Sequence, residues 1–174
     1  SLASQAIRGI AQDRDGHIWI GYEDHQAWSE YDGQSWRTYP TREEAVVARY
    51  DALLYAQRSD PRLWSSRPES GWLWLPMLDG RVKAYDGAQW RTYGEQDGIT
   101  RHTNLVAASS HGRVWVVGQG VSTAEEGDRH WDDHSLFAGV PDGSRVSTIA
   151  VDEQGSVWLA FVGPDSMGGG VGQL

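Results

Sequence analysis

Residues 31–39 read YDGQSWRTY, and residues 85–93 repeat this stretch almost unchanged as YDGAQWRTY. In both copies an Asp-Gly pair follows a Tyr and precedes a short segment in which apolar and polar residues mix. Glycine accepts the positive φ of the tight turns that match strand twist, so Asp-Gly in this setting indicates a β-hairpin. We therefore predict a hairpin for each copy, and a less regular third hairpin around EGDRHW at 126–131.

A second motif precedes each hairpin. It consists of a short apolar strand, a polar turn ending in Gly, and an answering strand that carries a Trp, and it is clearest at 7–21, 105–117 and 146–161. The Trp recurs at four positions, Trp19, Trp74, Trp115 and Trp158. In the first three units it stands 16 or 17 residues before the Trp of the following hairpin, so one register is shared. The second unit is degenerate, because its apolar stretch at 52–56 is separated from the Trp strand by a polar loop.

Two consecutive hairpins make a four-stranded antiparallel meander of about 40 residues, and such a sheet cannot bury both faces alone. Stacking copies around an axis gives a β-propeller, with the recurring Trp packed between neighbouring blades. The predicted fold is therefore all-β, with about three and a half to four propeller blades in this chain. Alternatively, the chain forms half of a larger propeller, or half of a propeller that a second copy completes in a dimer.

The blade boundaries follow from the repeats. We predict a single propeller segment over 1–174, with blade 1 at about 5–40, an insertion and the degenerate blade 2 at about 41–94, blade 3 at about 95–135, and a partial blade 4 at about 145–174. Within the insertion, Thr41 and Glu44 form a capping-box pattern before AVVA, which predicts one short helix over 41–50.

Composition excludes several classes of protein. The formal net charge of −9 repels phosphate backbones, so nucleic acid is not expected as a partner. The sequence contains no Cys, which removes disulfides, thiolate metal sites and cysteine nucleophiles. No apolar run reaches the roughly 18 residues of a membrane span, so this segment itself is not expected to contact a membrane. Ten Trp and seven Tyr against two Phe favour β structure.

The repeats resemble those of the two-component regulator propeller family. Residues 16–22 (GHIWIGY), the connector at 95–104 (EQDGITRHTN) and the two Tyr-Asp-Gly hairpins carry the resemblance. It implies a β-propeller of the kind found mostly in the extracytoplasmic sensor regions of bacterial membrane histidine kinases and related surface proteins. A periplasmic or extracellular location is thus implied, whereas no ligand is named.

Aromatic residues outside the repeated register are the candidate ligand contacts. Trp28, Trp64 and Trp72 break the register, and Tyr22 lies beside the variable loops. Aromatic rings at a propeller rim can stack on sugars or peptides. The alternative for these four residues is packing of the insertion.

Metal and cofactor signals are weak. The Asp13-Arg-Asp-Gly16 turn resembles the start of a calcium loop, but the later ligands are not aligned, and Asp and Gly are what the turn itself selects. His130 and His134 are four residues apart, which would bring them together on a helix but not on the expected strand edge. We therefore predict no metal and no cofactor.

The sequence favours a non-catalytic module that recognises a small molecule, a glycan or a protein. Such a module would be completed by further blades or by a second copy of the chain. The first alternative is an enzyme of the streptogramin-lyase type. Such enzymes are propellers built from similar repeats, and they use a His base and a magnesium ion bound by carboxylates. His102 and His111 are the candidate bases for it. The second alternative is a purely structural or oligomerising repeat.

Overall fold

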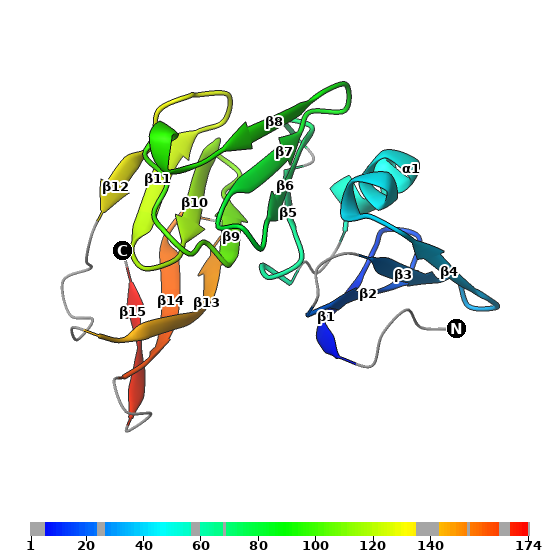
Figure 1. Cartoon of the computed structure of the whole chain (residues 1–174), viewed down its shortest axis with the longest axis horizontal. Helices are drawn as coiled ribbons and strands as arrows, with labels where there is room; N and C mark the ends of the chain where they lie inside the picture. Colours follow the sequence, from blue (N-terminus) through cyan, green and yellow to red (C-terminus); the bar gives the residue numbers. More distant parts are fainter. Residues whose placement is uncertain are drawn as a thin grey trace.

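In the part of the chain that the structure describes, the strands form four antiparallel sheets arranged as the blades of a β-propeller (Figure 1). The structure is a computed structural model and describes residues 6–23, 27–56, 60–67, 69–134, 143–152, 154–163 and 168–173. In every sheet the strand order follows the chain, as expected for meanders. The prediction of an all-β propeller is confirmed.

Blades 1 to 3 have four strands each in the described residues, and blade 4 has three. Blade 1 contains β1 (Ile7–Gln12), β2 (Ile18–Tyr22), β3 (Trp28–Tyr31) and β4 (Trp36–Tyr39). Blade 2 contains β5 (Ser65–Arg67), β6 (Trp72–Pro76), β7 (Val82–Tyr85) and β8 (Trp90–Tyr93). A short 3-10 helix, η1 (Glu95–Asp97), leads to blade 3, which contains β9 (Leu105–Ala108), β10 (Arg113–Val117), β11 (Val121–Glu125) and β12 (Asp132–His134). Blade 4 contains β13 (Arg145–Val151), β14 (Val157–Val162) and β15 (Gly169–Gln173).

The repeated Tyr-Asp-Gly stretch forms the β3–β4 and β7–β8 hairpins. In the first copy Asp32 Oδ1 accepts hydrogen bonds from the backbone N–H groups of Gln34 and Ser35, at 2.8 and 2.7 Å. Gly33 has a φ of 93°, a region that side chains with a Cβ rarely occupy. The turn residues therefore have the roles that the sequence predicted.

The insertion forms α1 (Arg42–Leu54), which begins where the capping pattern predicted. Thr41 is the N-cap, and its side chain accepts a hydrogen bond from the N–H of Glu44. The helix continues beyond residue 50, because the apolar residues at 52–54 pack into the core. Leu53, the middle one, is fully buried. The expectation that 52–56 opens blade 2 is thus wrong, and the innermost strand of that blade is Ser65–Arg67, within the predicted polar loop.

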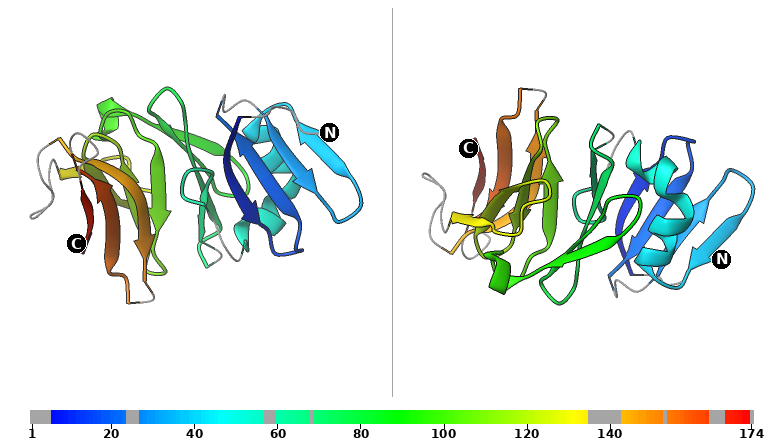
Figure 2. Two further views of the ribbon diagram at one scale, coloured as in Figure 1. Left: turned by 90° about the horizontal axis from the view of Figure 1, so that it is seen from below. Right: turned by 90° about the horizontal axis from the view of Figure 1, so that it is seen from above.

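Neighbouring blades bury three of the four recurring Trp rings between them. Trp19 packs in a cluster that includes Leu73 and Leu75 of blade 2, and the equivalent rings of blades 2 and 3 pack on blades 3 and 4. The blades stand side by side in this order (Figure 2). Trp19, Trp74 and Trp115 are 0, 1 and 6% exposed, whereas Trp158 of blade 4 is 41% exposed. Among the described residues, no apolar cluster joins blade 4 to blade 1.

Within the described part of the chain, no helix is long and apolar enough to span a bilayer. The helix α1 has 13 residues, of which five are acidic or basic.

Candidate functional site

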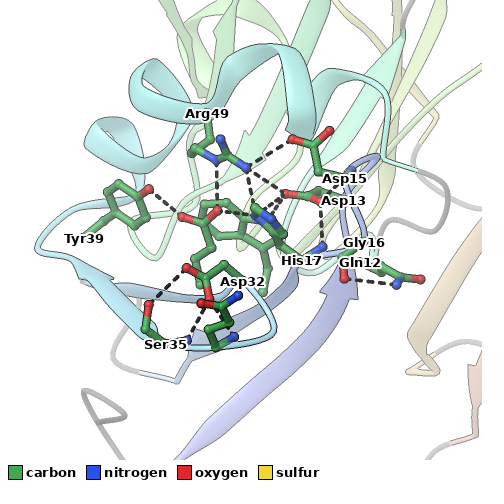
Figure 3. Close-up of polar contacts among 12 residues, drawn as sticks. Gln12, Asp13, Asp15, Gly16, His17, Asp32, Ser35, Tyr39 and Arg49 are labelled. Carbon is green, nitrogen blue, oxygen red and sulfur yellow. Dashed lines mark hydrogen bonds and ion pairs between the residues drawn. The ribbon is translucent and has the colours of Figure 1, made fainter.

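The densest network of charged side chains in blade 1 lies where α1 packs on the sheet (Figure 3). Its carboxylates are Asp13 in the β1–β2 turn and Glu30 on β3, which are only 1 and 4% exposed. His17 and Arg49 approach them from the turn and from the helix. Buried carboxylates require partners, so each contact in this network bears on the stability of the fold.

Asp13 holds the β1–β2 turn together. Its Oδ1 atom accepts hydrogen bonds from the backbone N–H groups of Asp15 and His17, both at 2.9 Å. Its Oδ2 atom accepts a hydrogen bond from Trp19 Nε1 at 2.8 Å. The same carboxylate therefore shapes the turn and fixes the orientation of the indole ring.

Glu30 is the second buried carboxylate, and it has a partner on each oxygen. Tyr39 donates its hydroxyl hydrogen to Oε2 at 2.7 Å. Burial, together with this hydrogen bond to a carboxylate, raises the pKa of Tyr39 above its usual value. Oε1 lies 2.7 Å from His17 Nδ1 and 2.9 Å from Arg49 Nε.

Arg49 brings a positive charge from α1 into this acidic setting. Its Nη2 atom lies 3.2 Å from Asp15 Oδ2 and 2.8 Å from His17 Nδ1. The backbone of Arg49 departs from helical geometry, with a φ of −131° and a ψ of 27°. Because His17 Nδ1 can accept from Arg49 only without a hydrogen and donate to Glu30 only with one, the ring selects one of these two partners at a time.

The network has the donor set of a cation site, and Arg49 supplies the cation. Asp13, His17 and Glu30 each offer one ligand atom, and these atoms lie within 4.8 Å of one another. The guanidinium group lies against the same three side chains. We therefore interpret the network as the ionic contact that docks α1 on blade 1.

The four predicted ligand-contacting aromatics do not gather at one place. Tyr22, Trp28 and Trp64 are buried, with Trp28 in contact with Trp64 at a centroid distance of 5.1 Å. Trp72 is partly exposed, stacks on Trp74 at 5.5 Å and has the Arg91 guanidinium 4.8 Å above its ring. The structure thus brings Trp28 and Trp64 together and places Trp72 against another cluster, and the role of all four in ligand contact stays a prediction.

The two candidate histidine bases are separated by a strand. His102 precedes β9 and His111 follows it, so the four residues of β9 and its flanking turns lie between them. At roughly 3.3 Å per strand residue, their backbones stand more than about 10 Å apart. His134 lies on β12, where its Nε2 atom is 3.0 Å from Thr123 Oγ1.

Sequence reasoning missed Glu30 and Arg49. Glu30 pairs with Trp19 across the β2–β3 ladder, so a carboxylate opposite the repeated Trp was a usable signal once the register was known. Arg49 offered no such signal, since its place in the network depends on how α1 packs against blade 1.

Comparison with known proteins supports the repeat assignment. Residues 1–24 match the family model of the two-component regulator propeller. Residues 1–24 are therefore similar to a two-component regulator propeller repeat. No curated protein sequence matches the chain.

Solved propellers match nearly the whole chain at low sequence identity. The extracellular domain of BT4673 from B. thetaiotaomicron is 16% identical with a TM-score of 0.56, and the match covers 99% of this chain and 28% of that one. Virginiamycin B lyase from Staphylococcus aureus is 13% identical with a TM-score of 0.58, covering 99% and 57%. YCF48 from Cyanidioschyzon merolae is 14% identical with a TM-score of 0.57, covering 99% and 51%. These likenesses concern the fold, and the chain spans less than two thirds of each of these structures.

Proposed function

We propose that the chain is part of a non-catalytic recognition propeller in the extracytoplasmic sensor region of a bacterial two-component signalling protein. The observation that carries the proposal is the regulator propeller repeat at 1–24, set in a fold that resembles the extracellular domain of BT4673 along its length. One solved structure of that domain is described as part of a hybrid two-component system. A rigid set of blades with an inserted helix suits recognition, because loops vary while the scaffold stays fixed.

The proposed ligand is a small molecule, a glycan or a protein, and thermal-shift screening of the chain against these classes tests the proposal. Binding to the folded state raises the unfolding temperature, and the shift grows with the ratio of ligand concentration to Kd. Trp72→Ala is the informative variant among the four predicted aromatics, since its ring is partly exposed. Trp36→Ala is the matched control, because Trp36 is an exposed Trp on the outer strand of blade 1. Absence of any shift across all three ligand classes would contradict the recognition role.

Virginiamycin B lyase matches the fold as well as the sensor domain does, so an enzyme is the competing function. The separation of His102 and His111 by β9 argues against their acting on one substrate. Incubation with quinupristin and Mg²⁺, followed by mass analysis of the products, separates the two functions. We expect intact quinupristin, and turnover abolished by His102→Ala or His111→Ala would overturn the non-catalytic assignment.

We also propose that the exposed face of blade 4 contacts a further blade, supplied by additional repeats or by a second copy. Trp158 and Val171, on one face of this blade, are 41 and 69% exposed. An exposed Trp at a position that is buried in the other three blades, with an exposed Val beside it, indicates a contact surface. Sedimentation at two protein concentrations tests the second copy, and a monomer at both would leave further repeats as the source.

A further inference from the structure

A cavity of about 620 Å³ lies where the inner strands of the propeller begin, and all four blades contribute to its lining. Its volume falls within the range of roughly 300–1,000 Å³ that is usual for small-molecule sites. Three of its residues are arginines, Arg8 of β1, Arg62 before β5 and Arg145 of β13, and one is acidic, Glu23. This excess of positive charge is unexpected in a chain whose formal net charge is −9.

Two irregular strands direct polar residues toward this cavity. The β1–β2 register shifts between Ile7 and Gly9, which makes Arg8 the extra residue of a β-bulge. The β13–β14 register shifts in the same way around Ser147. Bulges redirect a side chain that regular pairing would place elsewhere, and they are frequent beside functional sites.

The three arginine side chains differ in their contacts with the rest of the protein. Arg8 donates a hydrogen bond from Nη2 to the carbonyl oxygen of Asn104, at 3.2 Å, which connects blade 1 to blade 3. Burial and, next, the positive charge of Arg62 lower the pKa of Arg8, so the guanidinium groups are close enough to repel one another. Arg62 makes a two-pronged contact with Asp60, at 3.0 and 2.7 Å. Arg145 is exposed and forms no ion pair with any residue that the structure describes.

We propose that this cavity binds a small molecule carrying at least two negative charges on oxygen, such as a dicarboxylate or a phosphate ester, with Arg8 and Arg145 as its principal contacts. Guanidinium groups recognise carboxylate and phosphate oxygens through paired N–H donors, and a bound anion offsets the repulsion between Arg8 and Arg62. The inference rests on the proposed recognition function and specifies its ligand class.

Isothermal titration at low ionic strength with citrate and with inorganic phosphate tests the inference, with glucose as the neutral comparison. We expect citrate or phosphate to bind and glucose not to bind at this cavity. Arg145→Gln should weaken anion binding at least tenfold, and Glu23→Gln should strengthen it severalfold by removing a like charge. Arg113→Gln is the matched control, because Arg113 is an exposed arginine of β10 that pairs with Glu125 on the next strand.

Arg8→Gln is a second test, and circular dichroism establishes that each variant is folded. The inference is overturned if neither anion binds, or if Arg145→Gln and Arg113→Gln weaken binding equally. Binding of a neutral sugar or a peptide without anion binding would also overturn it, while leaving the recognition function in place. Failure of every ligand class would instead contradict the recognition function itself.

Discussion

The first turns of blades 1 and 4 make the same three hydrogen bonds, but only blade 1 buries its indole ring. In blade 4, Asp152 Oδ1 accepts from the N–H groups of Gln154 and Ser156 at 3.0 and 2.8 Å, and Oδ2 accepts from Trp158 Nε1 at 3.1 Å. Asp13 makes the equivalent bonds in blade 1. The orientation of the Trp is therefore set locally, within one turn, before any neighbouring blade packs on it.

The two regions differ in what lies against the Trp face. Trp19 is covered by blade 2 and α1, whereas Trp158 is left 41% exposed. The positions of His17 and Glu30 in blade 1 correspond to Ser156 and Gln173 in blade 4, so the ionic network is specific to blade 1. These local hydrogen bonds are thus common to blades 1 and 4, and burial and charge distinguish the two blades.

The largest expected difference is between Trp19→Ala and Trp158→Ala. Truncating a fully buried Trp costs about 4 kcal/mol of unfolding free energy, because transfer and cavity terms add. Trp158→Ala should cost about 1 kcal/mol or less, as is usual for a partly exposed position. Urea denaturation of both variants measures the difference. Equal losses that grow with protein concentration would show instead that a second copy covers Trp158.

Arg49→Met tests the network that blade 4 lacks. It leaves the buried carboxylates of Asp13 and Glu30 without their principal cation, which should cost about 3 kcal/mol. Arg113→Met is the control, since the Arg113–Glu125 pair is exposed and should be worth about 0.5 kcal/mol. Chemical denaturation at neutral pH measures both. A loss no larger than that of the control would mean that Arg49 does not dock α1 on blade 1.

Asp13→Ala tests the shared turn in its buried setting. The variant removes the acceptor of three hydrogen bonds and leaves the indole N–H of Trp19 buried without a partner, at a cost of about 2 kcal/mol. Asp152→Ala should have less than half this effect, because water reaches Trp158 and replaces the lost acceptor. Thermal unfolding of the two variants provides the comparison, and equal effects would contradict a role for burial.

The sequence was sufficient to predict the features that repeat. The Asp-Gly hairpins and the Trp register depend on local turn chemistry and on strand alternation, so the blades and the burial of Trp19, Trp74 and Trp115 were predictable. The same register predicted burial of Trp158, which was wrong because no further blade packs on it among the described residues. The start of α1 was predictable for the same reason, since Thr41 caps it locally. Its end was not, because residues 52–54 are equally apolar in a helix or a strand, and packing decides between them.

The site was less predictable than the fold. The buried network combines residues from a turn, a strand and a helix, and a single sequence does not show which of them meet. The three arginines that line the cavity are far apart in the sequence, with 54 residues from Arg8 to Arg62 and 83 from Arg62 to Arg145. Only the packing of the blades side by side brings them to one cavity.

The smallest expected effect is the pH dependence of the Asp152–Trp158 hydrogen bond. The N–H donated by Trp158 is the main reason that the pKa of Asp152 is lower than usual. A carboxyl whose pKa is lowered by folding stabilises the protein above its unfolded pKa of about 4, and this stabilisation is lost as the pH falls through the folded pKa. Trp158→Phe removes the donor and keeps an aromatic ring, so it should be less stable than the parent chain at pH about 6 and approach it at pH about 3. Urea midpoints across this range measure the effect, and a stability difference independent of pH would show that the ring, and not the hydrogen bond to Asp152, accounts for it.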